Sequence, residues 1–544
     1  MSTPSTRELE RLLRLGVALS AERNLPRLLC RIVGEAQSMT DADGGTLYLL
    51  GEDERSLDFA IIRNRSLGIA VNACGEVNRQ FEPVPLVDES GEPNHGHVAA
   101  HVALTGKPVV IDDVYDTGHG YDIEGVRRFD ARHGYRTRSL LSVPMRDHEE
   151  TVIGVLQLVN RIEGESQSPV PFRMRDILLA EALASQAAVT LTNRRLIQGL
   201  EDFIDAFVRV IATAIDEKNP HTANHCKRVP AITLMLAEAV SRTEQGPLAD
   251  FRLSDRDRRE IELAAWLHDC GKIATPEYIL DKATKLHTLY DRIGLIETRF
   301  AALRSQLEIE HLRSEPDEQD GDDLARQRRR QALEARLAEL DEALDFLRQC
   351  NRGAEFMDEA DRERVREIGR WTWLDHEGRE RPLLTDEEIE CLTIPKGTLT
   401  PREREIINNH IVVTQRMLEQ LPFPKHLRNI PEYAGGHHER VDGKGYPRGL
   451  TREQLSVPAR IMAIADVFEA LTDRDRPYKT GKTLSEALDI LRRMRDDGHI
   501  DPDLFEVFVR ERVYLEYARE YLDESQIDLD ESAVEAEYPN IKLS

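Results

Sequence analysis

Histidine and aspartate residues recur in short segments that lie far apart along the chain. The first of these segments, NPHTANHCKRV, contains His225, and the last, RIMAIADVFEALT, contains Asp466. A carboxylate on an apolar helix costs free energy unless it is paired or bound to a metal. The pattern therefore predicts that several helices converge and share one polar centre.

The segment IELAAWLHDCGK places His268 and Asp269 at the end of an apolar helix, and Gly271 is expected to stop that helix. Adjacent imidazole and carboxylate groups suit a metal ion, although a buried histidine bonded to a nearby acid is at least as common. Upstream, His221 and His225 are one helical turn apart, so both face the same point if the helix has already begun there.

Two further segments supply histidines. The predicted helix REREIINNHIVVTQRMLEQL carries His410 on its apolar stripe. GGHHERVDGKGYPRGL places His437 and His438 before a loop whose backbone freedom lets both rings converge. Alone, each histidine is more often a core or capping residue than a ligand. Taken as a set, these nitrogen and oxygen ligands favour iron or manganese, and the lack of a thiolate cluster disfavours structural zinc.

Charge and composition limit the partners of this centre. The formal net charge of −26 argues against a broad electrostatic contact with duplex nucleic acid or an anionic membrane. The apolar stretches are short and Met1–Arg14 lacks a secretory signal core, so we expect a cytoplasmic protein without membrane insertion. The six cysteines form no CxxC pair and predict no disulfide framework. An anionic substrate must therefore meet a local cationic site.

Short β-rich runs precede the histidine-bearing segments. They predict an α+β domain over residues 20–170, with an antiparallel sheet and flanking helices. The segments ADGGTLYLL, LTGKPVVIDD, RSLLSVPM and VIGVLQLVNR resemble a GAF domain. This resemblance implies a sensor whose sheet cups an unidentified small ligand or mediates dimerisation. The predicted strands are 44–50, 57–63, 108–112, 139–145 and 152–160.

A long helical stretch is expected at residues 171–217, with apolar residues at alternating spacings of three and four. That spacing is typical of a coiled-coil seam. One interpretation is a signalling helix that pairs across a homodimer, and the other is a buried helix packed on its own domain. The seam residues are Leu200, Phe203, Phe207, Val210 and Ala214.

A second heptad pattern occupies residues 286–350 on both sides of the acidic tract SEPDEQDGDD. It predicts a helical hairpin, followed by a connector to residue 397. Nothing in this region resembles a catalytic site, and binding of a partner protein is one role for it. Its apolar positions are Leu289, Ile293, Ile296, Phe300, Leu303, Leu307, Leu333, Leu337, Leu340, Leu344 and Leu347.

The ordered elements HTANH, HDCGK, NNH, HHERVDGKGYP, ADVFEALT and RPYK resemble the HD-GYP family, a branch of the HD phosphohydrolases that hydrolyses cyclic di-GMP. The resemblance covers residues 200–285 and 398–515, so the hairpin resembles an insertion in an all-α bundle and residues 516–544 an acidic tail. It implies two divalent metals bridged by Asp269. One would be held by His225, His268, Asp269 and Asp466, and the other by His410, His437 and His438.

The same resemblance implies that Lys272, Arg476 and Lys479 bind phosphate, although they also fit a set of surface cations. Some members of the family carry a glutamate at the position of His221 that helps to bind a third metal. We therefore expect two metals and leave His221 as an open additional ligand. Tyr446 is assigned no catalytic step, because a structural turn and a substrate-facing loop fit it equally well.

The resemblance implies a cyclic di-GMP phosphodiesterase regulated by its N-terminal sensor, with Asp269 and Lys272 as catalytic residues. Two cations lower the pKa of a shared water, which then attacks phosphorus. One alternative is hydrolysis of another cyclic dinucleotide or a nucleotide, and a second is a non-catalytic signalling scaffold. The sequence does not decide whether the product is linear pGpG or GMP.

Overall fold

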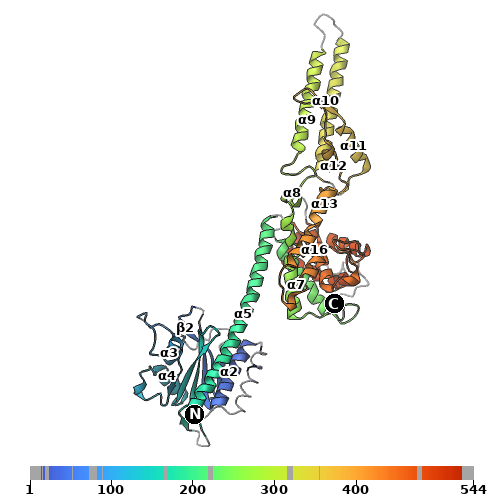
Figure 1. Ribbon diagram of the computed structural model, residues 1–544. Coiled ribbons are helices and arrows are strands. Elements are labelled where there is room, and N and C mark those ends of the chain that lie inside the picture. The colour runs from blue at the N-terminus through green and yellow to red at the C-terminus, as the bar shows by residue number, and fades with distance from the viewer. Residues whose placement is uncertain are drawn as a thin grey trace. The chain divides into compact units, whose positions relative to one another are not determined.

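The computed structural model describes residues 24–529 apart from 52, 73–81, 89, 164–167, 219–223, 315–322, 354–355 and 475–480, together with residues 14, 16, 18 and 22. The chain divides into two compact units, Met1–Phe203 and Ile204–Ser544. The first unit is built on a β-sheet and the second is largely helical (Figure 1). The predicted fold class is therefore confirmed.

An antiparallel sheet organises the first unit, with the central strand order β3-β2-β1-β7-β6-β5. Alternating side chains of β7 enter different cores, since Leu156 and Leu158 face one side and Val155 the other. All five predicted strands are present. The strands are β1 Ala42–Leu50, β2 Ser56–Asn64, β3 Ile69–Asn72, β4 Val84–Pro85, β5 Val109–Ile111, β6 Leu140–Arg146, β7 Val152–Ile162 and β8 Pro169–Val170.

Helices cover both faces of this sheet. On one face, α2 (Leu25–Thr40) packs together with the first half of α5 (Met174–Lys218). On the other face, α3 (Val98–Thr105) packs against β6 and β7, and α4 (Glu124–His133) contributes to the same core. Both faces of the sheet are therefore buried, which explains the nearly continuous apolar runs of its central strands.

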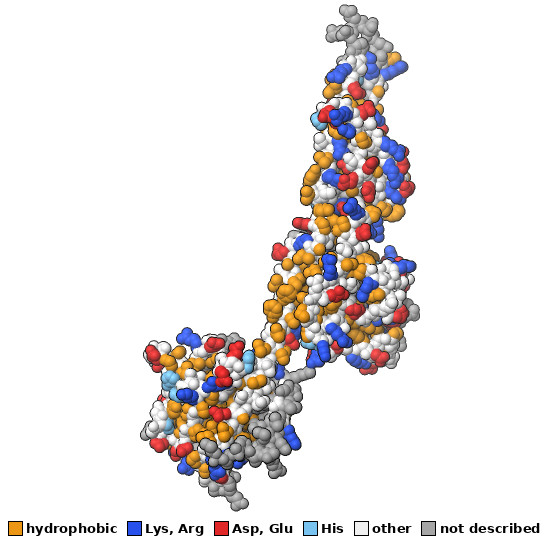
Figure 2. Space-filling model, viewed as in Figure 1, with side chains coloured by type: hydrophobic (Ala, Val, Ile, Leu, Met, Phe, Trp, Pro, Cys, Tyr) orange, Lys and Arg blue, Asp and Glu red, His pale blue; other side chains and the backbone are white. Residues whose placement is uncertain are grey.

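The helix α5 runs from the first unit into the second. Its C-terminal half packs Val208, Ala212 and Ile215 into a core of the second unit. The adjacent stripe of predicted seam residues stays exposed, with Leu200 63% and Val210 66% accessible. Hydrophobic side chains accordingly line the surface of α5 in Figure 2. Packing on its own domain therefore explains the apolar residues on one face of α5. It does not explain the exposed apolar residues of the seam.

Helices of the second unit surround α16, whose buried face contributes Ile461, Ile464, Ala465 and Phe468 to the largest core. No helix among the described residues combines the length and apolar character that a membrane span requires. The helices are α6 His225–Ser241, α7 Asp255–Leu267, α8 Glu277–Leu280, α13 Pro401–Asn408, α14 His410–Leu418, α15 Ile430–Gly435, α16 Val457–Thr472, α17 Leu484–Asp496, α18 Pro502–Arg510 and α19 Val513–Tyr521.

The core of the second unit continues past residue 515, where the sequence analysis predicted an acidic tail. Tyr517 on α19 is fully buried. Gln526 is 2% exposed, and its Nε2 donates to the carbonyl groups of Thr472 and Lys482. The acidic residues of this segment lie on its exposed side, so they obscured the apolar stripe that packs inward. The predicted tail is therefore corrected, because its first part belongs to the folded bundle.

The region between α8 and α13 forms a subdomain with a core of its own. The helices α9 (Ile293–Arg313) and α10 (Asp323–Asn351) form the predicted hairpin. The region expected to be a connector also folds, into α11 (Glu359–Gly369), α12 (Asp386–Leu392) and the two-stranded sheet β9–β10 (Thr372–Leu374 and Glu380–Pro382). Its side chains complete the hairpin core, so the hairpin is not self-sufficient.

Candidate metal centre

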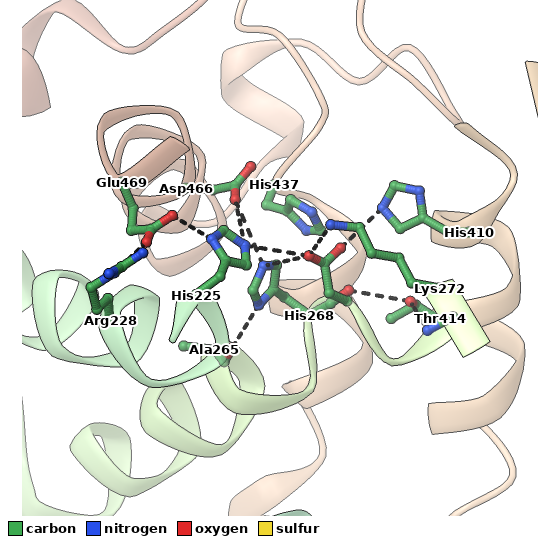
Figure 3. Close-up of polar contacts among 12 residues, drawn as sticks. His225, Arg228, Ala265, His268, Lys272, His410, Thr414, His437, Asp466 and Glu469 are labelled. Atoms are coloured by element: carbon green, nitrogen blue, oxygen red, sulfur yellow. Dashed lines mark hydrogen bonds and ion pairs between the residues drawn. The ribbon is translucent and has the colours of Figure 1, made fainter. Parts of the chain in front are cut away.

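Side chains from five helices meet at one buried point of the second unit (Figure 3). The helix α6 contributes its first residue, α7 the two residues that follow its end, and α14 its first residue. Two histidines follow α15, and an aspartate comes from the middle of α16. The residues are His225, His268, Asp269, His410, His437, His438 and Asp466. The fold thus brings together every predicted metal ligand that lies among the described residues.

The ligand-type atoms form three overlapping groups, and within each group all the atoms lie within 4.8 Å of one another. One group resembles the first predicted metal site and another the second. The third group contains Asp269 and shares one histidine with each of the other two. The groups are His225, His268 and Asp466; His410, His437 and His438; and His268, Asp269 and His437.

The two oxygens of Asp269 face different groups. Oδ2 lies 3.4 Å from His225 Nε2 and 3.3 Å from His268 Nε2. Oδ1 lies 3.2 Å from His410 Nε2. A carboxylate with one oxygen toward each group could be shared between two cations, and the bridging role that the resemblance implied stays a prediction.

Four of the imidazole rings are held by Nδ1 and direct Nε2 toward the centre. The Nδ1 atoms of His268, His410 and His437 lie 2.6, 2.5 and 2.6 Å from backbone carbonyl oxygens three residues earlier. The Nδ1 of His225 instead contacts the Glu469 carboxylate. In all four rings Nε2 is buried and makes no hydrogen bond with the described residues. Buried polar atoms are rarely left without a partner, so these nitrogens fit divalent cations.

The charge balance of the two groups differs. Burial lowers the pKa of His268, but the Asp269 and Asp466 carboxylates outweigh burial and raise it to about 9. Burial lowers the pKa of His438 to about 4, with a contribution from His410. Without a cation, protons therefore favour the carboxylate-rich group, whereas His437 and His438 of the other group have lowered pKa values and stay neutral. A metal cation that binds to the carboxylate-rich group displaces these protons, and one that binds to the three-histidine group is coordinated by its imidazole nitrogens.

Gly271 allows the turn after Asp269 to approach α14. A Cβ atom at Gly271 would lie 2.0 Å from the carbonyl oxygen of His410, and Thr414 Oγ1 accepts the Gly271 N–H at 2.9 Å. This residue lies in the 3₁₀ helix η3 (Cys270–Ala274) and does not stop α7 in a left-handed conformation, which corrects the expectation for Gly271. The close contact between this turn and α14 therefore depends on the small size of Gly271 and not on a left-handed backbone conformation.

Lys272 follows this turn and reaches back to the bridging carboxylate. Its Nζ donates to Asp269 Oδ2 at 2.5 Å. The ammonium group holds the pKa of Asp269 well below its ordinary value, although burial alone would raise it. Lys272 is therefore placed beside the centre, while its predicted contact with phosphate stays a prediction.

The loop after His438 is held against the centre. The ring of Tyr446 stacks on His438 with centroids 4.8 Å apart. A Cβ atom at Gly445 would lie 2.2 Å from the backbone nitrogen of Arg440, so only glycine permits this close return of the loop. The buried Glu439 carboxylate accepts the backbone N–H of Arg448 at 2.8 Å. The loop thus supports the His438 ring.

Three predicted residues, His221, Arg476 and Lys479, lie outside the described residues. The helix α6 is described from His225 onward, so the expected pairing of His225 with His221 stays a prediction. The structure does correct the local reasoning for one ligand. The predicted helix around His410 is divided into α13 and α14, and His410 begins the second.

Glu469 is the contact residue that the sequence analysis missed. It is fully buried on α16, three residues after Asp466 and on the same apolar helix. The cost of burying a carboxylate, which drew attention to Asp466, applies equally to Glu469. The signal was therefore present, but the partner that explains it lies 244 positions away in the sequence.

Comparisons with known families agree with this two-part arrangement. The family model described as a GAF domain matches residues 24–191. Two models described as HD domains match residues 222–362 and 387–504. Among solved structures, a GAF domain of an Acinetobacter phosphoenolpyruvate-protein phosphotransferase is 16% identical, with a TM-score of 0.26, and the match covers 36% of this chain and 99% of that one.

Curated relatives are similar in a shorter region. A 3'3'-cGAMP-specific phosphodiesterase of Vibrio cholerae is 43% identical over 128 residues, which cover 24% of this chain and 28% of the relative. A cyclic di-GMP phosphodiesterase of Pseudomonas aeruginosa is 42% identical over 115 residues, which cover 21% of this chain and 26% of the relative. The chain thus spans about a quarter of the length of these relatives. With the family matches and the ligand set together, the chain contains a GAF domain followed by an HD domain, as the resemblance to the HD-GYP family implied.

Proposed function

We propose that this protein is a metal-dependent phosphodiesterase that hydrolyses cyclic di-GMP. The observation that carries the proposal is the position of Asp269 between two groups of inward-facing histidines, with one oxygen toward each group. Such an arrangement serves chemistry that needs two cations close together. A scaffold that only binds a partner has no need of buried imidazole nitrogens without hydrogen bonds.

The residues of the centre fit two divalent cations. We assign one to His225, His268, Asp269 and Asp466, and the other to His410, His437 and His438 with Asp269 shared. Iron and manganese suit this mixture of nitrogen and oxygen ligands. When bound, the pair supplies an activated water and stabilises negative charge on the phosphoryl oxygens.

The chain itself orients and neutralises the substrate in this proposal. Asp269 fixes the spacing between the two groups, and the turn at Gly271 sets its distance from His410. Lys272 is partly exposed, with 24% of its side chain accessible, and its ammonium group can move from Asp269 to a phosphate oxygen. Arg476 and Lys479 are proposed to contribute further positive charge.

The reaction at phosphorus is better constrained than the identity of the bases in the substrate. Relatives of comparable identity are named for cyclic di-GMP and for 3'3'-cGAMP. The metal centre acts on phosphorus and does not select a base. 3'3'-cGAMP is therefore the second candidate substrate, and the linear dinucleotide and GMP are the candidate products.

The test is hydrolysis by the full chain, purified without oxygen and loaded separately with Fe²⁺ and Mn²⁺. Products from cyclic di-GMP and 3'3'-cGAMP are separated by liquid chromatography. We expect turnover of cyclic di-GMP, and none in Asp269→Asn, whose amide cannot provide the shared negative charge. Glu260→Gln is the matched control, because Glu260 is also a buried carboxylate of α7 but bonds Asn429 instead of the centre. Turnover by Asp269→Asn with full metal content would contradict the assignment.

We further propose that the GAF domain regulates this activity within a parallel homodimer joined through α5. The exposed seam residues keep the spacing of a coiled coil over Leu196–Ala214. The end of the same helix reaches the centre, since Lys218 Nζ donates to the carbonyl groups of Lys272 and Ile273. A shift of α5 would therefore move the turn that carries Asp269.

Insertions near Gln198 test this regulation, because each added residue rotates the helix by about 100°. We expect activity that depends on whether one or two residues are inserted, and a dimer by light scattering that Leu200→Glu separates. Equal turnover of both insertions and of a chain that begins near Leu200 would favour a passive tether.

A further inference from the structure

The Glu469 carboxylate lies behind the metal centre, on the far side of the His225 ring. Its side chain is fully buried, and Oε2 contacts His225 Nδ1. Figure 3 shows this carboxylate on the opposite side of the ring from Asp466, and Asp269 Oδ2 lies 3.4 Å from Nε2 of the same ring. Glu469 therefore touches a proposed ligand without facing the space between the two groups.

This contact differs from those of the other ligand histidines. His268, His410 and His437 each use Nδ1 to contact a neutral backbone carbonyl group. Among these four rings, His225 alone is paired with a charged group at Nδ1. A carboxylate that accepts the Nδ1 proton fixes the ring and makes Nε2 a stronger donor toward a cation than a carbonyl does.

The guanidinium group of Arg228 holds the Glu469 carboxylate in place. Arg228 Nε donates to Glu469 Oε1 at 2.6 Å, and its Nη2 donates to Asp473. Glu469 and Asp473 occupy consecutive turns at the end of α16, and Arg228 lies one turn after His225 on α6. The charged pair therefore joins the two helices that carry His225 and Asp466. A buried carboxylate with fewer partners would be costly and would lack a fixed position.

We infer that Glu469, fixed by Arg228, is a positioning residue that strengthens metal binding at the group of His225, His268 and Asp466 and leaves the group of His410, His437 and His438 unaffected. The two sites are then expected to bind metal with unequal affinity, because their ligands differ in charge. The first has two carboxylates at the centre and a third behind His225, whereas the second relies on three imidazoles and the shared Asp269. This inference deepens the proposed function and rests on it.

The test measures metal binding directly. Metal-free full chain is titrated with Mn²⁺, and bound metal per chain is counted after equilibrium dialysis. Glu469→Gln keeps the size of the side chain and removes its charge. We expect the binding of one cation to weaken about 10- to 100-fold, while the other keeps its affinity. Co²⁺ absorption spectra should change for the same single cation.

Glu388→Gln is the matched control. Glu388 is 2% exposed and accepts from Arg299 at 2.7 and 2.9 Å, so this variant also breaks a buried glutamate–arginine pair, but in the inserted subdomain. Its two Mn²⁺ affinities should equal those of the unmodified chain. The control separates an effect on the metal centre from a general loss of stability.

The outcomes separate this inference from the proposed function. Unchanged binding in Glu469→Gln, or equal weakening of both cations, would overturn the inference. If that variant does not fold, Arg228→Lys keeps the charge but loses the two-point contact, and it should show a smaller loss of the same cation. Unchanged affinity in Arg228→Lys would then count against the inference. Two unequal Mn²⁺ sites in a chain that hydrolyses no cyclic dinucleotide would refute the proposed substrate alone.

Discussion

Raising the pH should destabilise the metal-free second unit, because protons on buried histidines balance its carboxylates. The pKa of His268 is raised to about 9 by Asp269 and Asp466, against the opposing effect of burial. In the unfolded chain a histidine has a pKa of about 6.5. A raised folded pKa gives stability that is complete below the unfolded value and disappears as pH rises through the folded value. The window therefore runs from about pH 6.5 to about pH 9.

The size of the effect follows from the shift. A difference of about 2.5 pKa units, at 1.36 kcal/mol per unit, corresponds to about 3 kcal/mol from His268. The pKa of His225 is also raised, so its contribution has the same sign. His438, with a pKa of about 4, acts only below the window, where the unfolded chain takes up a proton and the folded chain does not. Between about pH 6.5 and about pH 9, the change in stability therefore comes from the carboxylate-rich group and not from His438.

Urea unfolding followed by tryptophan fluorescence measures this effect. All three tryptophans, Trp266, Trp371 and Trp373, lie in the second unit, so the signal reports on that unit alone. For the metal-free chain, the free energy of unfolding should fall between about pH 6.5 and about pH 9. For the Mn²⁺-loaded chain, the stabilisation by metal should grow over the same range, because fewer protons compete for the ligands.

The variant His268→Gln distinguishes this cause from others. Its metal-free form should lose the part of the slope that comes from His268, since glutamine does not titrate, and keep the part that comes from His225. A metal-free chain whose stability is constant or rises through the window would refute the reasoning. An unchanged slope in His268→Gln would likewise show that the titration belongs to other groups.

Two further predictions concern packing around the centre. Gly271→Ala should cost roughly 1–3 kcal/mol and weaken metal binding, because the added methyl group would separate Asp269 from His410, and thermal unfolding with metal analysis would show both effects. Compared with a chain that ends at residue 529, a chain that ends at residue 515 should lose at least about 3 kcal/mol of stability, because it lacks the buried Tyr517. Equal free energies of unfolding for these two chains would support the predicted tail instead.

Much of this protein can be read from local sequence. The five predicted strands and the helix α5 are present because the alternation of apolar residues and their three-to-four spacing are properties of neighbouring positions. The candidate ligands were also found from sequence, because an imidazole or carboxylate on an apolar helix is costly without a partner. Asp466 shows this reasoning, since its apolar surroundings alone marked it as unusual.

Local patterns also misled in places where charge concealed packing. The segment after residue 515 has an acidic character that predicted a solvated tail, yet Tyr517 and Gln526 are buried. Similarly, the heptads of α9 and α10 predicted a hairpin followed by a mere connector, whereas the helices α11 and α12 of that connector complete the hairpin core. In both cases the contacts that decide the outcome are made by residues distant in the sequence.

The sequence by itself determined which side chains are available for metal chemistry, and only the tertiary structure decided how they are arranged. That Asp269 lies between His225 and His410 depends on a close contact between the turn at Gly271 and α14, which no local pattern encodes. The pairing of His225 with Glu469 joins residues 244 positions apart. Ring orientation and the separation of charges are set by packing between helices, because the cost of a buried charge indicates that a partner exists without identifying it.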